Sequence, residues 1–395
     1  MENILHWILL VLFFLLLGLL ILSLGLVLLK SIGIILRTIF KKTNVSQLKN
    51  LKTTCTWTLY LAVGVVVVSL ISQLTASTPS VDGEDAIAEL TKVTLNGESQ
   101  WISIRGVDKD ADVLLFLAGG PGGSQLAAVR HELSELETEF VVVGWDQPGS
   151  AKTFNLGSDL EVEDYIKDGL ALTEYLCERF DKEKIYVVGE SWGSALGVMM
   201  ASERPERFHA LVSAAQMVDF LETELIDYSK ALELSTSKGD TEKMIKLLEN
   251  GAPPYYGKDV TWKIAEYISY LGHEMDINPQ ITNPGYDTLR DIFSVEYGMI
   301  DKINYVRGII QTFNRIYPKL YDMDLRVSYR TLHVPVKFIV GRHDINAPSE
   351  LSEDYFKKLS APSKEWVWFE SSGHSPWINE SDKFVDEIMK MKNIP

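Results

Sequence analysis

The sequence 186-YVVGESWGSALGVMMA-201 runs from β-branched and apolar residues, through Gly189-Glu190-Ser191-Trp192-Gly193, into small residues with helical spacing. A serine between two glycines at a strand-to-helix junction is typical of a nucleophile elbow. The glycines leave room for the tight turn that exposes the serine hydroxyl, and the next helix then points its N-terminus at a developing oxyanion. Ordinary glycine-rich turns match the same five residues, so the rest of the chain has to supply a base and an acid.

Strand-like and helix-like segments alternate on both sides of this junction. Asn96-Gly97 lies between two β-rich runs and predicts a hairpin. The short apolar runs that are typical of buried strands lie at 113–120, 140–145, 185–189, 210–215, 336–341 and 365–369. Helical spacing is found at 124–139, 161–180, 194–203, 349–359 and 381–392. This alternation predicts a mostly parallel sheet with helices on both faces, formed by residues 90–216 and 332–395.

The alternation stops between residues 217 and 331, where helix-like, Tyr-rich segments replace it. An insertion of this length is too long for an ordinary loop. We expect it to form a helical cap over a pocket.

A serine hydroxyl becomes a useful nucleophile only when a base takes its proton. His374, one of seven histidines, lies in 370-ESSGHSPW-377, directly after the last predicted strand. Asp344 follows the strand 336–341 and can hold the tautomer of that base. The order Ser191, Asp344, His374 is that of the α/β-hydrolases, whose fold the alternation also predicts. The alternative for His374 is a solvent-exposed loop histidine. His343, next to Asp344, is expected to be a structural loop residue.

An oxyanion needs two hydrogen-bond donors in addition to the three side chains. The backbone N–H of Trp192 is one candidate, because it follows the nucleophile. Gly120, in 118-AGGPGG-123 after the strand 113–117, is the other, since Pro121 has no N–H. The alternative for this glycine-rich segment is a flexible turn.

These motifs resemble the proline iminopeptidase branch of the α/β-hydrolases, peptidase family S33, over roughly residues 90–392. The family pattern is His-Gly-Gly-Pro-Gly, then Asp-Gln-Arg-Gly-x-Gly, then Gly-x-Ser-Trp-Gly. The similar segments here are 118-AGGPG-122, 146-DQPGS-150 and 189-GESWGS-194. The resemblance implies a triad of Ser191, Asp344 and His374, an oxyanion hole at Gly120 and Trp192, and a structural role for Asp146. Ala118 and Pro148 depart from the family's histidine and arginine, which puts the substrate specificity in question.

An aminopeptidase of this kind also needs acids in the cap to bind the free α-amine of its substrate. The candidates are Glu222, Glu224 and Glu296, and nothing in their spacing singles one out. The alternative for each is a surface acid on a cap helix.

Two uncharged apolar stretches precede the sheet, at about 4–29 and 53–76. Each is longer than the ~20 residues that cross a bilayer. We expect residues 1–76 to be a membrane anchor of two transmembrane helices, and 77–89 to be a linker. A cleaved signal peptide is the alternative for the first stretch.

Charge predicts the orientation of this anchor. Between the two stretches lie six basic side chains and no acid: Lys30, Arg37, Lys41, Lys42, Lys49 and Lys52. Basic loops stay in the cytoplasm, so the large C-terminal part should be extracellular. The whole chain carries a net charge of −16, which disfavours nucleic-acid binding. An extracellular part with only Cys177 has no disulfide framework, which favours a bacterial cell surface.

The sequence therefore predicts a membrane-anchored serine hydrolase that releases N-terminal residues from short peptides and uses no metal or cofactor. An esterase, lipase or amidase of the same fold, acting on small or lipid-like substrates, is the second hypothesis. A non-catalytic sensor or binding protein is the third.

Overall fold

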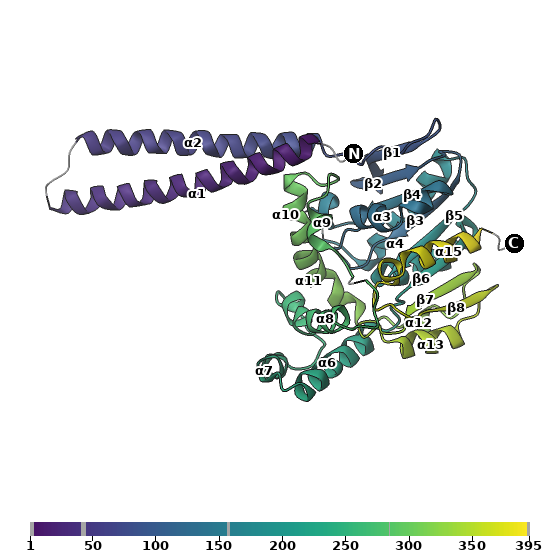
Figure 1. The fold of residues 1–395 in the computed structure, drawn as a ribbon. Coiled ribbons are helices and arrows are strands. Elements are labelled where there is room, and N and C mark those ends of the chain that lie inside the picture. The colour runs from purple at the N-terminus through teal and green to yellow at the C-terminus, as the bar shows by residue number, and fades with distance from the viewer. Residues whose placement is uncertain (1–3, 41–44, 156–158, 284, 393–395) are drawn as a thin grey trace. The chain divides into compact units, whose positions relative to one another are not determined.

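The computed structural model describes residues 4–40, 45–155, 159–283 and 285–392 (Figure 1). The chain forms two compact units. One consists of Met1–Pro79 together with Val295–Lys302, and the other of Ser80–Ser294 together with Ile303–Pro395.

The first unit is built on the helices α1 (Ile4–Ile39) and α2 (Val45–Leu74), which pack against each other. A hydrogen bond of 2.6 Å joins the hydroxyls of Ser23 and Thr58 across this pair. Both helices are long and apolar enough to cross a membrane, by length and composition alone. Helix α1 continues past the first predicted stretch and α2 begins before the second, because these segments contain Leu, Lys and Arg, which are good helix formers, while α2 ends two residues earlier than predicted. Lys41 and Lys42 of the basic loop lie outside the described residues.

Polar contacts hold the segment Val295–Lys302 in this first unit. The amide of Gln73 donates to Asp301 at 2.8 Å, and the hydroxyl of Thr78 donates to Glu296 at 3.2 Å. An added Cβ at Gly298 would lie 2.7 Å from the Cα of Gln73, so glycine permits this close approach.

An eight-stranded sheet forms the centre of the second unit, in the order β1-β2-β4-β3-β5-β6-β7-β8. Strands β1 and β2 form an antiparallel hairpin, β2 pairs antiparallel with β4, and the remaining pairs are parallel. The hairpin turns at Asn96 and Gly97, which both have positive φ, as its sequence predicts. The strands are β1 (Ile87–Leu95), β2 (Glu98–Gly106), β3 (Asp112–Leu117), β4 (Phe140–Asp146), β5 (Ile185–Glu190), β6 (Phe208–Ala214), β7 (Val336–Gly341) and β8 (Lys364–Phe369).

Helices cover both faces of this sheet because its central strands are apolar on both sides. In β3, Leu114 and Phe116 pack in one core cluster, while Val113, Leu115 and Leu117 pack in the other. On the Leu114 side lie α3 (Leu126–Glu132), α14 (Pro376–Asn379) and α15 (Ser381–Met391). On the other side lie α4 (Val162–Arg179), α5 (Trp192–Glu203) and α13 (Ser349–Lys358). This arrangement is the α/β-hydrolase fold that the sequence predicts.

Between β6 and β7 the described residues, 215–283 and 285–335, form helices and no strand of the sheet. Their bounds are α6 (Phe220–Ser237), α7 (Thr241–Asn250), α8 (Val260–Asp276), α9 (Thr288–Ile292), α10 (Met299–Arg307), α11 (Phe313–Ile316) and α12 (Leu325–Ser328). A π-helical turn at Gly308–Thr312 joins α10 to α11.

The helix predicted at 124–139 is shorter than expected. Only Leu126–Glu132 is α-helical, and Ser134–Thr138 forms a 3-10 turn. The start is delayed because Ser124 is already engaged, by its hydroxyl with Asp146 and by its carbonyl with Tyr305 at 2.8 Å. These side-chain contacts compete with helix formation at the first turn.

Candidate active site

Ser191 occupies the tight turn between β5 and α5. Its φ of 54° lies in the left-handed region, which a non-glycine residue rarely adopts. An added Cβ at Gly189 would collide with the carbonyl of Gly193, and one at Gly193 would collide with the carbonyl of Leu117. The backbone N–H of Ser191 is bound to the carbonyl of Ala214 at 3.0 Å. The local geometry is therefore that of a nucleophile elbow.

Asp344 and His374 lie on two loops that follow β7 and β8, as predicted, and the structure brings them together. Nδ1 of His374 lies 3.0 Å from Oδ2 of Asp344. The loops approach backbone to backbone, since the N–H of His343 donates to the carbonyl of Ser372 at 2.9 Å. The Asp344 carboxylate also accepts from the N–H groups of Asn346 and Ala347, at 2.8 and 2.9 Å. Both side chains are therefore held at the carboxyl edge of the sheet.

The charge state of His374 follows from these contacts. Burial alone would lower its pKa, but the Asp344 carboxylate and, to a smaller extent, Glu190 raise the pKa of His374 to about 9. In the part of the chain that the structure describes, His374 makes no hydrogen bond with the Ser191 hydroxyl. Contacts of this kind are often long without substrate and shorten when it binds.

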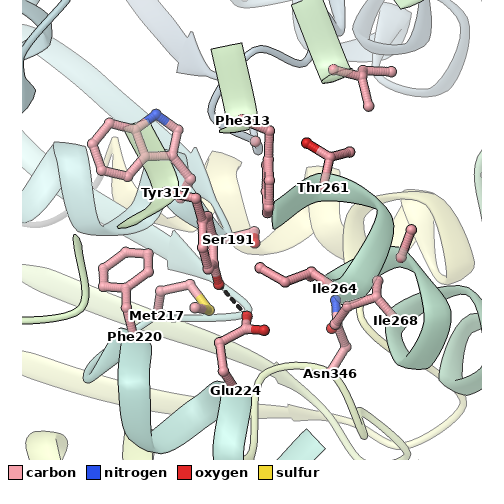
Figure 2. A pocket seen from close by; sticks show the side chains of 14 residues that line it. Ser191, Met217, Phe220, Glu224, Thr261, Ile264, Ile268, Phe313, Tyr317 and Asn346 are labelled. Carbon is pink, nitrogen blue, oxygen red and sulfur yellow. Dashed lines mark hydrogen bonds between the residues drawn. The ribbon is translucent and has the colours of Figure 1, made fainter. Parts of the chain in front are cut away.

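Ser191 opens onto a cavity of about 200 Å³ between the sheet and the cap (Figure 2). Gly120 and Trp192 line it beside the serine, and Asn346 lines it from the Asp344 loop. The other walls are mostly apolar, formed by Met217, Phe220, Ile264, Ala265, Ile268, Ile309 and Phe313. This volume is below the ~300–1,000 Å³ of pockets that enclose drug-sized ligands. It suits one small apolar group bonded to the reacting carbonyl.

Glu224 places a carboxyl group in this apolar wall. It comes from α6 and is 1% exposed, and it accepts hydrogen bonds from the hydroxyls of Tyr267 and Tyr317. Figure 2 shows the contact with Tyr317 and the position of the carboxyl group at the cavity. Burial raises the pKa of Glu224 to about 7, although the two tyrosine hydroxyls oppose the rise. The group can therefore be ionised at neutral pH and pair with a cation.

Asp227, one helical turn after Glu224, is fully buried. Neither of its carboxylate oxygens has a hydrogen-bond partner among the described residues. Burial and the nearby Glu224 carboxylate raise its pKa well above the usual value. Of these two acids, Glu224 is the one whose carboxylate is stabilised by hydrogen bonds, from Tyr267 and Tyr317.

The other two cap candidates lie elsewhere. Glu222 pairs with Arg326 at 2.5 Å, and its side chain is 45% exposed. Glu296 belongs to the first unit and is bound by Thr78. Neither is among the described residues that line the cavity at Ser191.

The segment after β3 contributes Gly120 to the cavity, where its φ is +138°. Gln147 links this segment to Trp192, because its amide donates to the carbonyl of Ala118 and accepts from the Trp192 indole, both at 2.9 Å. Asp146 accepts from the Ser124 hydroxyl and, at 2.9 Å, from the N–H of Lys152. The two residues after Trp145 therefore brace the expected oxyanion-binding segment.

Sequence reasoning missed Glu190, the residue before the serine. Its buried carboxylate accepts from the amide of Gln125 at 3.0 Å and contacts the hydroxyl of Tyr286. An added Cβ at Gly119 would collide with this carboxylate. Burial raises the pKa of the Glu190 carboxyl, although His374 and Gln125 oppose the rise, and Glu190 in turn raises the pKa of His374. A charged residue inside a glycine-flanked turn was the signal available in the sequence.

Comparison with known proteins places this chain in a family. Residues 112–235 match the family model of the alpha/beta hydrolase fold. A relative named "Probable aminopeptidase YbaC", from Bacillus subtilis (strain 168), is 31% identical over 77% of this chain and 96% of its own length. The chain belongs to the α/β-hydrolases of the proline iminopeptidase-like branch. A proline iminopeptidase of Lactobacillus crispatus (strain ST1) is 22% identical to this hydrolase, over 76% of this chain and 96% of its own length.

Solved structures agree on the fold of this hydrolase. A proline iminopeptidase from Mycobacterium smegmatis superposes with a TM-score of 0.54 and 17% identity, covering 76% of this chain and 96% of its own. At this identity the likeness concerns the fold alone.

Proposed function

We propose that this hydrolase is a membrane-anchored serine aminopeptidase that releases the N-terminal residue of short peptides through an acyl-enzyme on Ser191. The observation that carries the proposal is the carboxyl group of Glu224, which faces the same small apolar cavity as Ser191. A free α-amine is a cation near neutral pH, and a buried carboxylate is its natural partner. The apolar walls suit the side chain of the residue that is released.

The chemistry follows from the positions of three side chains. His374 takes the proton from the Ser191 hydroxyl as the oxygen attacks the peptide carbonyl, and Asp344 holds the imidazole in the required tautomer. The N–H groups of Trp192 and Gly120 stabilise the oxyanion. His374 then gives its proton to the leaving amine, and a water molecule activated by His374 hydrolyses the ester.

The cap explains a preference for short peptides. The cavity lies between the cap helices and the elbow, so a folded protein chain does not reach Ser191. The helices α1 and α2 would hold the enzyme in the membrane. The basic segment between them would face the cytoplasm, and the hydrolase would face the outside.

A substrate panel on the full chain in detergent tests this function. We expect proline, alanine and leucine 4-nitroanilides to be hydrolysed, and their N-acetylated forms to lose at least about 10-fold in kcat/KM because the ammonium group is gone. Ser191→Ala should abolish this activity and also labelling by a fluorophosphonate.

The alternative functions give different results in the same panel. Hydrolysis of short acyl 4-nitrophenyl esters without any cleavage of free-amine substrates would show an esterase. Absence of fluorophosphonate labelling in the wild type, with the fold intact by circular dichroism, would favour a binding protein.

A further inference from the structure

A second cavity, of about 260 Å³, lies beside the first. His374 and the adjoining Gly373 line it from the loop after β8, and Met275 and Asp276 line it from the end of α8. Ile281, from the segment that follows α8, closes it against Gly373. The cavity therefore lies on the side of the site occupied by the histidine.

Two residues border both cavities. Ile268 and Asn346 line the cavity at Ser191 and the cavity at His374. The nucleophile thus faces one space and its base faces the other, and the two spaces adjoin. A substrate bond that is cut between Ser191 and His374 would have one half in each.

The chemistry of the triad assigns the two halves. The acyl half stays bonded to Ser191, beside the oxyanion donors. The leaving nitrogen receives its proton from His374, so it must lie on the side of the imidazole. We infer that the second cavity binds the residue that follows the cleaved bond, and that it prefers a lysine or arginine there. This inference rests on the proposed function.

The lining supports a long cationic side chain. Ile268, Met275 and Ile281 provide an apolar wall for methylene groups. Asp276 is the one acidic side chain among the described residues that line the cavity. It ends helix α8, and the C-terminus of a helix also attracts positive charge. A glutamate in the leaving group would be repelled by the Asp276 carboxylate and by the C-terminus of α8.

The space itself depends on Gly373. A Cβ at this position would lie 3.0 Å from Sδ of Met275 and 3.2 Å from Cδ1 of Ile281. The contact shows that Ile281 points toward the loop that carries His374. A larger side chain at position 281 would therefore reduce the cavity without touching Ser191.

The experiment compares leaving groups on one acyl group. For the residue that the panel identifies as X, kcat/KM is measured for X-Lys-NH₂, X-Gly-NH₂, X-Glu-NH₂ and the X methyl ester. We expect X-Lys-NH₂ to exceed X-Glu-NH₂ by about 1.5- to 5-fold, the range for an ion pair with an exposed carboxylate such as Asp276. Asp276→Asn should remove this preference. The control Glu274→Gln removes another acid of helix α8, one that pairs with Lys238 at the end of α6, and should keep the preference.

A steric variant supplies a second readout. Ile281→Trp should lower kcat/KM for all three peptides at least 10-fold and change the methyl ester by less than about 2-fold, because that leaving group is too small to need the cavity. Fluorophosphonate labelling of each variant reports the integrity of the triad. Equal losses on peptide and ester, or an unchanged lysine preference in Asp276→Asn, would overturn the inference.

Failure of the proposed function is distinguishable from failure of this inference. If no free-amine peptide is cleaved, the choline ester and the neutral 3,3-dimethylbutyl ester of an accepted acyl group take the place of the peptides. A preference for the choline ester that Asp276→Asn removes would support the cavity assignment alone. Equal rates for the two esters would refute it.

Discussion

Glu224 controls how activity should depend on pH. Because burial raises its pKa to about 7, the carboxylate that binds the substrate amine is lost as the pH falls through 7. His374, with a pKa of about 9, must also be deprotonated to act as a base. Both groups are therefore active in their deprotonated forms, and acid removes both.

The variant Glu224→Gln should separate the effect of protonating Glu224, which weakens binding of the substrate amine, from the effect of protonating His374, which removes the base. In the wild type, kcat/KM for a free-amine anilide should fall more steeply below pH 7 than for a neutral ester, which needs only His374. The variant should lose about 10- to 100-fold on the anilide, the range for a hydrogen bond to a charged group. Its two profiles should then have the same slope. Glu222→Gln, a change on the exposed side of α6, is the matched control and should behave as wild type. Profiles with equal slopes in the wild type would contradict this role.

Two acids of the site, Glu224 and Glu190, differ in how far their burial could be predicted from the sequence. The buried residues of α6 include Phe220, Glu224, Asp227 and Tyr228, which follow helical spacing. That periodicity was present in the sequence and would have favoured Glu224 over Glu222, two positions away on the opposite face. By contrast, the contact of Glu190 with Gln125 joins residues 65 positions apart, and no local pattern reveals it.

At the scale of elements, the π-helical turn after α10 packs against two loops of the active site, the loop after β3 and the loop after β4. Its first residue, Gly308, approaches so closely that an added Cβ would lie 2.7 Å from the carbonyl oxygen of Gly122 and 2.8 Å from that of Gly149. The hydroxyl of Thr312 also donates to the Gly149 carbonyl at 2.8 Å. The cap is thus attached to the segment that carries Gly120.

The variant Gly308→Ala tests this attachment. A methyl group there must displace the backbone of the Gly120 segment, so the oxyanion donor would move from its position. Removing one such donor costs about 10²–10³-fold in kcat, and we expect a loss of at least about 10-fold on the methyl ester. Gly272→Ala is the control on the same methyl ester: its added Cβ meets nothing within 4 Å, and this ester does not need the second cavity, which Gly272 lines. A normal kcat in Gly308→Ala, with unchanged stability, would show that the turn does not position the donor.

Most strands of the sheet were predictable: six of them, β3 to β8, contain short apolar runs, and the hairpin of β1 and β2 is indicated by Asn96-Gly97 between two β-rich runs. The triad loops could be ordered for the same reason, since each follows a strand that the pattern reveals. The π-helical turn was not predictable. It depends on glycines at 122, 149 and 308, which approach one another only in the folded chain.

At the scale of the whole molecule, the contacts of the linker were beyond sequence reasoning. Thr78 of the linker donates to Glu296, 218 positions away, and this contact helps to hold Val295–Lys302 in the N-terminal unit. Two apolar stretches and a basic segment predict an anchor and its orientation. They say nothing of which cap residues the linker meets.

The orientation of the chain in the membrane is open to direct measurement. Translocation of the basic residues between α1 and α2 is unfavourable, so this segment should remain in the cytoplasm and the acidic hydrolase should lie outside. In a Cys55→Ser background, we expect Glu98→Cys in the hydrolase to react with an impermeant maleimide on intact cells. Ser46→Cys should react only after permeabilisation. Both introduced thiols replace exposed side chains, and Cys177 is buried.

An N-terminal epitope retained on the full 44.5 kDa chain would exclude cleavage of α1 as a signal peptide. Labelling at position 46 in intact cells would reverse the assigned topology, and with it the proposal that the enzyme acts on extracellular peptides.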